Sequence, residues 1–135
     1  MSIVSITTLK TYFETGDFPT QQEFIDLIDT LANNGTLVGS AAGLTATGTN
    51  QATALVITSA KNRIDTVAAG TGVKPNQTAA VGFSQTVQNE GANDLAYFPF
   101  LGDNILGQAV NTSVTISAGN QLTVFCYTAG ELTLI

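Results

Sequence analysis

Beyond residue 50 the chain is a succession of short apolar or alternating runs separated by turn residues, and this spacing most limits the folds open to it. The runs "ATALVIT", "VGFSQTV", "LAYFPF" and "QLTVFCY" are of strand length and lie between segments rich in Gly, Asn, Ser and Thr. Strands that recur roughly every 8–12 residues are typical of all-β sandwiches and barrels. The sequence therefore predicts a mainly β protein in which residues 51–135 form a small antiparallel β-sandwich or barrel domain.

The end of the chain predicts a hairpin. In "QLTVFCY" the residues Leu122, Val124 and Cys126 share one face, and Phe125 and Tyr127 share the other. The turn sequence Thr-Ala-Gly then leads into the last run, "ELTLI". Cys126 alternates with core-facing residues and has no histidine partner, so we expect a buried structural thiol.

The stretch "FPTQQEFIDLIDTLANNG", residues 18–35, predicts a helix. Thr20 and Glu23 form a capping box, in which each side chain accepts from a backbone N–H at the helix start. Gly35 follows two asparagines and is suited to the left-handed cap at the helix end. A shorter helix is expected over residues 8–15.

Four large side chains of the second helix fall at the i, i+3, i+4 and i+7 spacing and form one apolar stripe: Phe24, Leu27, Ile28 and Leu31. A lone helix of this length is marginal in water, so the stripe must be covered. The β domain, copies of the same helix or another protein could cover it. These four residues are the candidate oligomerisation or docking interface.

The distribution of charge divides the chain into three parts. Residues 1–35 form the helical N-terminal segment and are acidic. Residues 36–50 are predicted to be an uncharged linker, because no charged residue occurs between positions 36 and 60. This Gly/Ala/Thr-rich stretch fits a flexible tether or an ordered connection between subunits equally well. Residues 51–135 are the predicted β domain.

Composition excludes two classes of partner. Charged residues make up 10% of the chain, against about 25% in typical domains. The net charge is −6, and four basic residues are too few to follow a nucleic acid backbone. No apolar run approaches the roughly 20 residues that span a bilayer, and the N-terminus lacks the pattern of a secretory signal. We therefore expect neither nucleic acid nor membrane binding.

The residues that usually carry catalysis are scarce. The chain has no histidine, and the Gly-x-Gly of "AAGTGVKPN" lacks the spacing of a phosphate-binding loop, so a turn is the better interpretation. Asp94 and Asp103 lie in turn sequences, where solvated carboxylates are more common than a calcium site. We expect no enzyme activity, no metal and no cofactor.

Two functional alternatives remain from the residues alone. The aromatic run at residues 97–100 fits the core, yet Tyr97, Phe98 and Asp103 could instead form a ligand surface on which a sugar stacks. A small glycan hydrolase would need two carboxylates about 5–10 Å apart in a cleft. Asp94, Asp103 and Glu131 are examples of residues that could supply such a pair.

The opening "LKTYFETGDFPTQQEFIDLIDTL" resembles a segment near the N-termini of bacteriophage virion proteins, especially fibre-like ones. The remainder is similar to a small β domain of phage structural proteins. "GTNQATALVITSAKNRIDTVAAGTGVKP" matches its first part. The second part carries "N-x-G-A" before an aromatic strand, then "GD-x-I", then "AGN" before the last hairpin.

This resemblance implies a non-enzymatic virion protein, usually a homotrimer, that decorates the capsid or forms fibres. Its implied partners are copies of itself and other virion proteins such as the major capsid protein. Its implied location is the virion, assembled in the cytoplasm of a bacterial host. The short chain favours a capsid decoration protein of the cement or head-fibre kind. A tail-fibre or spike tip that binds host polysaccharide is the alternative.

Overall fold

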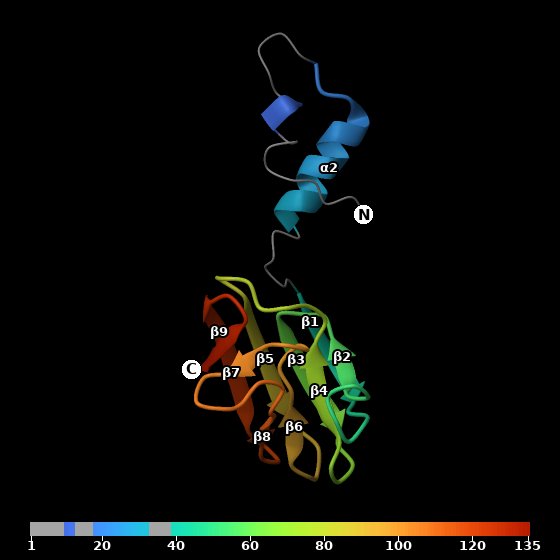
Figure 1. Ribbon diagram of the computed structural model, residues 1–135. Helices are drawn as coiled ribbons and strands as arrows, with labels where there is room; N and C mark the ends of the chain where they lie inside the picture. The colour runs from blue at the N-terminus through green and yellow to red at the C-terminus, as the bar shows by residue number, and fades with distance from the viewer. Residues whose placement is uncertain (1–9, 13–17, 33–38) are drawn as a thin grey trace. The chain divides into compact units, whose positions relative to one another are not determined.

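The computed structural model describes residues 10–12, 18–32 and 39–135, and it divides into two compact units (Figure 1). One unit spans Met1–Thr36 and the other spans Leu37–Ile135. The second unit contains all the strands described below and is called the β unit.

The N-terminal unit contains helix α2 (Gln21–Ala32), which begins with the predicted capping box. The backbone N–H of Thr20 donates to Glu23 Oε2 at 2.6 Å, and the N–H of Glu23 donates to Thr20 Oγ1 at 3.3 Å. Lys10 and Thr11 are helical, while most of the predicted helix at 8–15 lies outside the described residues. Within the described part of the chain, no helix is long and apolar enough to cross a bilayer.

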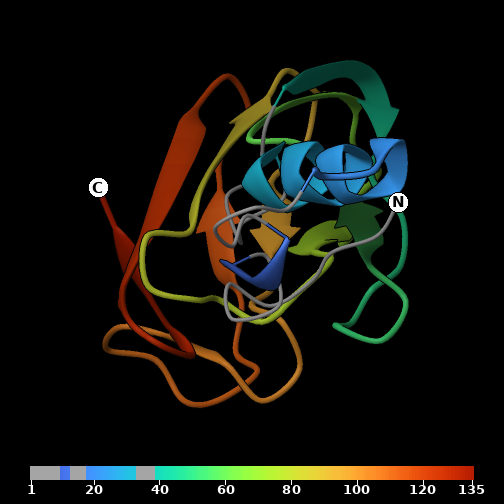
Figure 2. The same cartoon turned by 90° about the horizontal axis from the view of Figure 1, so that it is seen from above.

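Two sheets make up the β unit. The six-stranded sheet has the order β1-β3-β5-β9-β10-β7, and the four-stranded sheet has the order β2-β4-β6-β8. In the view from above (Figure 2), β9 and β10 lie on the opposite side of this unit from β1 and β2. The strand bounds are β1 Ser40–Thr45, β2 Leu55–Ile57, β3 Lys61–Thr66, β4 Gly72–Pro75, β5 Ser84–Asn89, β6 Leu95–Tyr97, β7 Asn104–Ile105, β8 Val114–Ile116, β9 Gln121–Thr128 and β10 Glu131–Leu134.

The strands are stacked in a solenoid-like way, which corrects the antiparallel prediction. β1, β3 and β5 are parallel neighbours in one sheet, and β2, β4 and β6 are parallel neighbours in the other. Consecutive strands therefore alternate between sheets, and the chain returns to each sheet in the same direction. Only the later strands pair antiparallel, as in β5–β9, β6–β8 and the predicted hairpin β9–β10.

Strand β1 lies inside the stretch predicted to be a linker, so the β unit begins earlier than residue 51. It pairs with β3 from Ser40↔Lys61 onward, and the register shifts between Ala41 and Leu44. Gly43, at φ +72°, supplies the left-handed conformation at that irregularity. Ala and Gly are poor strand formers, which is why the sequence does not predict a strand here, and pairing with β3 overrides that tendency.

The core lies between the two sheets and holds aliphatic side chains with one phenylalanine, one tyrosine and the cysteine. Its largest fully buried members include Tyr97, Phe83, Ile57, Ile64, Leu95, Ile105 and Leu132. In β9 the predicted alternation is confirmed, since Val124 and Cys126 are buried whereas Tyr127 is 64% exposed. All buried core residues lie between positions 46 and 132, so the β unit has a core of its own.

Removal of residues 1–36 should leave residues 37–135 folded, because none of the core residues that the structure describes comes from the deleted part. We expect a cooperative thermal transition by circular dichroism, with a Tm within about 5 °C of the full chain. A variant that also lacks residues 131–135 loses the buried Leu132 and should not fold. Loss of the transition in the first truncation would contradict the division into two units.

Candidate functional site

The structure places Tyr97 in the core, as the sequence favours for the aromatic run, and it also buries Asp103, so two of the three residues of the alternative ligand surface are not exposed. Tyr97 is fully buried, and its hydroxyl donates to Gln85 Oε1 across the core at 3.0 Å. Burial raises the pKa of this phenol well above its usual range, and the Asp103 charge adds to the shift. Phe98 is half-buried, and its ring lies so close to Gly72 that a Cβ there would be 2.7 Å from the ring.

Asp103 is only 4% exposed, and both carboxylate oxygens accept hydrogen bonds. Thr78 Oγ1 donates to Oδ1 at 2.8 Å, and the backbone N–H of Ala79 donates to Oδ2 at 2.8 Å. These two hydrogen bonds hold the loop before β7 against the segment before β5. It is therefore not available to the calcium ion or the glycan substrate considered from the sequence, whereas Asp94 is exposed and Glu131 half-buried.

No group of three or more His, Cys, Asp or Glu side chains forms a metal site among residues 10–12, 18–32 and 39–135. Cys126 is buried, as predicted. Its thiol donates to the carbonyl oxygens of Ala79 and Thr128 at 3.4 and 3.1 Å. Burial raises the pKa of this thiol, which keeps it in the protonated form.

The helical stripe is partly open to solvent. Ile28 is 61% exposed and Phe24 is 49% exposed, while Leu27 is half-buried. Ile25, beside the predicted stripe, is 41% exposed, and Phe18 before the helix is 94% exposed. The side chain of Leu31 lies outside the described residues. The role of this stripe in oligomerisation or docking stays a prediction.

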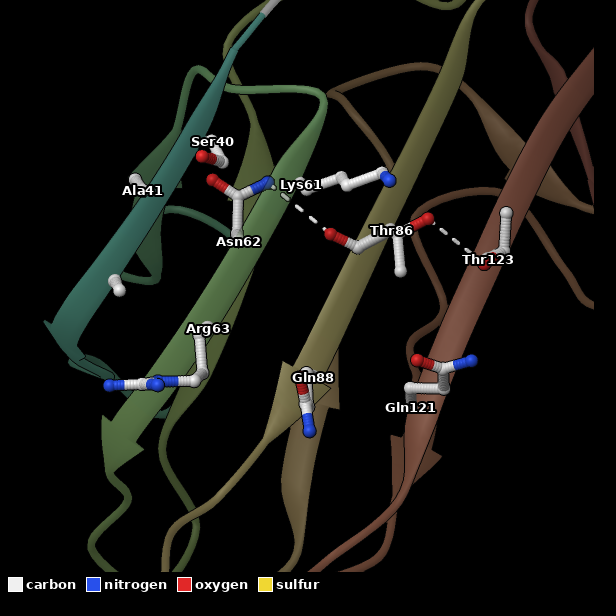
Figure 3. Close-up of a pocket in the computed structure, with 10 residues that line it drawn as sticks. Ser40, Ala41, Lys61, Asn62, Arg63, Thr86, Gln88, Gln121 and Thr123 are labelled. Atoms are coloured by element: carbon white, nitrogen blue, oxygen red, sulfur yellow. Dashed lines mark hydrogen bonds between the residues drawn. The ribbon is translucent and has the colours of Figure 1, made fainter.

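A hollow of about 370 Å³ opens on the outer face of the six-stranded sheet, across β1, β3, β5 and β9 (Figure 3). We call it the sheet-face pocket. Its lining is polar or small: Ser40, Ala41, Ala42, Lys61, Asn62, Arg63, Thr86, Gln88, Gln121 and Thr123. No carboxylate is among these residues.

Strand alternation explains why most of these side chains face outward, while the buried Asn62 lies on the core side of β3. In β5 the inward residues Gln85 and Val87 are buried, so Thr86 and Gln88 point to the other face. The same alternation in β3 turns Lys61 and Arg63 outward. A core on one side of the sheet thus fixes the composition of the pocket on the other.

Register aligns these side chains in two rows across the sheet. One row joins Lys61 to Thr86 and Thr86 to Thr123, and the two hydroxyls lie 3.0 Å apart in a hydrogen bond. The second row joins Arg63 to Gln88 and Gln88 to Gln121. The floor of the pocket is therefore an ordered array of hydroxyl and amide groups bordered by two cations.

The two cations differ in their neighbours. Arg63 makes a bidentate ion pair with Asp65, with Nε–Oδ1 and NH2–Oδ2 distances of 2.7 and 3.0 Å. Lys61 makes no ion pair with any residue the structure describes. Beside them, Asn62 is 3% exposed and donates through Nδ2 to the carbonyl oxygen of Ser59 at 2.7 Å. Its Oδ1 is buried and accepts no hydrogen bond from the described residues, which is costly for an amide oxygen.

An aromatic pair continues the same face along β9. Phe125 and Tyr127 follow Thr123 at alternate positions, so their side chains also point outward. Their ring centroids lie 4.5 Å apart with an interplanar angle of 51°. The face thus combines hydrogen-bonding groups, cations and exposed aromatic carbon, an arrangement suited to non-covalent binding.

Comparison with protein families, with curated proteins and with solved structures finds no match to this chain.

Substitution Asp103→Ala should destabilise the β unit by about 2 kcal/mol, because it leaves the buried N–H of Ala79 without its acceptor. Chemical denaturation of the full chain measures this free energy. Asp94→Ala removes an exposed carboxylate from another turn and should change stability by less than about 0.5 kcal/mol. Equal effects of the two substitutions would contradict an anchoring role for Asp103.

Substitution Arg63→Gln should raise the pKa of Asp65. The Arg63 hydrogen bonds hold the pKa of this carboxyl below its usual range in the folded protein. A lowered folded-state pKa stabilises the fold above the unfolded-state pKa, and that contribution is lost as the pH falls through the folded-state value. The contribution is small here because the pair is exposed to solvent.

An NMR titration of the Asp65 side-chain carboxyl carbon measures this change directly. In Lys61→Gln, which removes the neighbouring outward cation of β3, the pKa of Asp65 should stay as in the wild type. An unchanged Asp65 pKa in Arg63→Gln would show that the ion pair does not persist in solution.

Proposed function

We propose that this chain is a non-enzymatic structural protein of a bacteriophage virion, a homotrimeric capsid decoration protein of the cement or head-fibre kind. The proposal joins the resemblance of its N-terminal segment to virion proteins with the division of the chain into a helical unit and a β unit. In this function the helical unit associates with copies of itself and with the capsid, and the β unit is displayed on the particle.

The exposed apolar side chains of the helical unit are the observation that carries the proposal. Ile28 is 61% exposed, and Phe18 just before the helix is 94% exposed. A soluble surface rarely keeps several large apolar groups together unless another molecule covers them. Covering each such side chain is worth about 1.5–3 kcal/mol, which is enough to drive association when three copies contribute.

The capping box also supports self-association of the helical unit. It specifies the start of a 12-residue helix, yet a helix of this length is marginal in water without packing. Self-association covers the apolar side chains of Phe18 and Ile28, which are exposed in a single chain. The number three comes from the resemblance, since fibre-like virion proteins are usually trimers.

The low charge of the β unit also fits dense packing on a particle. Residues 36–60 carry no charge, and they include the edge strands β1 and β2 of the two sheets. Edge strands of solitary proteins are usually protected by charged residues, which keep other chains away. An uncharged edge tolerates close contact with neighbouring subunits.

The double substitution Leu27→Asp/Ile28→Asp should abolish assembly, because it places two carboxylates in the stripe that the subunits share. Light scattering should show the mass of a single subunit, and cosedimentation with capsids of the encoding phage should be lost. The circular dichroism of the β unit should be unchanged, since its core contains no residue of the helix.

A matched control places the same charges on the β unit. Leu101 and Val110 are 71% and 57% exposed, so Leu101→Asp/Val110→Asp should leave both mass and capsid binding as in the wild type. A wild-type protein that is a single subunit and does not bind capsids would refute the proposal. The same conclusion would follow if the helix variant kept full assembly.

A further inference from the structure

We propose that the sheet-face pocket, together with Phe125 and Tyr127, binds an acidic oligosaccharide. This function lies on the β unit, goes beyond virion assembly and does not depend on the proposal made for the helix. It uses residues other than Tyr97, Phe98 and Asp103, the ligand surface predicted from the sequence.

The polar floor of the pocket matches a ligand rich in hydroxyl groups. Gln121 carries an amide that can both donate and accept, and Thr123 adds a hydroxyl group. The Nε2 of Gln88 donates to the Glu90 carboxylate, which leaves its amide oxygen as an acceptor. Sugar hydroxyls likewise donate and accept, so they can bind this array without leaving an unpaired group. Strands in a sheet are about 4.8 Å apart, so the four strands of the pocket span about 14 Å, which is enough for several linked sugar rings.

The aromatic pair supplies the apolar contact that a sugar ring needs. Tyr127 is 64% exposed and tilted against the half-buried Phe125. Outward positions of a sheet that faces water are normally polar, so two successive aromatic residues there indicate a partner with an apolar face. Phe125 lies about 6.8 Å along β9 from Thr123, so a bound chain can stack on the rings and reach the polar floor.

Charge selects an acidic ligand over a neutral one. The chain has a net charge of −6 and only four basic residues, and two of them, Lys61 and Arg63, line this pocket. Arg63 is paired with Asp65, so Lys61 is the cation that a ligand can bind. Lys61 makes no ion pair with any described residue, so a ligand carboxylate can bind it without displacing another anion. Two cations remain too few to hold a nucleic acid backbone.

A second copy of this sheet fits the face less well than a sugar chain. The centres of protein interfaces are depleted in lysine, and here Lys61 and Arg63 stand at the pocket. Two faces related by a two-fold axis would each bring this pair of cations to the shared interface. A hydrated ligand with its own negative charge avoids that repulsion.

The test is an NMR titration of the full-length protein with three defined probes. Tetragalacturonic acid carries the proposed chemistry, maltotetraose is neutral and of equal length, and galacturonic acid is a single acidic ring. We expect saturable amide shifts in β3, β5 and β9 with tetragalacturonic acid. Maltotetraose should bind at least about threefold more weakly, as the loss of an exposed charge contact predicts, and galacturonic acid more weakly still.

Variants assign the contacts. Tyr127→Ala should weaken binding of tetragalacturonic acid about tenfold by removing the stacking ring. Lys61→Gln should weaken it roughly threefold and leave maltotetraose unaffected. The matched controls Leu101→Ala and Lys10→Gln alter an equally exposed apolar residue and a cation outside the pocket, and they should bind as the wild type does.

Several results would overturn the inference. The first is the absence of saturable shifts with either tetrasaccharide, and the second is equal affinity for the two tetrasaccharides. The third is an affinity for galacturonic acid equal to that for tetragalacturonic acid, which would indicate simple anion binding. A fall in mass by light scattering in Tyr127→Ala would show that a second copy covers the face. Gln121→Ala provides a second pocket variant, and wild-type binding by both it and Tyr127→Ala would place the ligand elsewhere.

Discussion

The side chain of Asn89 links the two sheets of the β unit by a hydrogen bond. It is fully buried at the end of β5 and donates through Nδ2 to the carbonyl oxygen of Ile116 on β8 at 2.9 Å. The same nitrogen reaches the carbonyl oxygen of Asn93, and Oδ1 accepts from the N–H of Gly91 at 3.0 Å. An unpaired amide would be costly there, so the turn after β5 is held in one path. That path allows Gly91 to approach Val67, where a Cβ would be 2.6 Å from the valine side chain.

The outer face of the sheet depends on this arrangement. Asn89, Val87 and Gln85 face inward, and the two-residue period of a strand then forces Gln88 and Thr86 outward. Gln85 in turn accepts from the hydroxyl of Tyr97 on the opposite sheet, which fixes β5 against β6. A slip of one residue in β5 would exchange the two sets of side chains, exposing the core and destroying the pocket together. The binding face is therefore as well ordered as the core behind it.

The sequence predicted the positions of the strands better than the pairing between them. Spacing and alternation located β2, β5 and β6, the hairpin β9–β10 and the capped helix α2, because those signals are local. They do not tell which strands pair, and here the partners repeat at unequal distances, as in Ser40↔Lys61 and Lys61↔Thr86, so no fixed period is visible. The sequence leaves a surface role open for Tyr97 and Asp103, because the groups that hydrogen-bond them inside the fold, Gln85 and Thr78, are distant in sequence. The pocket was missed for the same reason.

The uneven distribution of charge separates the two proposed functions. Residues 1–35 carry a net charge of −4 out of the −6 of the whole chain, so the β unit is close to neutral and its pocket can be locally cationic. Charges exposed to water are screened beyond about 8 Å at physiological salt, so Lys61, which has no ion-pair partner among the described residues, acts mainly on groups that enter the pocket. An acidic ligand is then selected by Lys61 at short range rather than by the charge of the chain. Salt should weaken the binding of an acidic ligand by screening the charges. Salts that strengthen apolar burial should instead favour assembly through the apolar side chains of the helix. The two functions can therefore be altered independently.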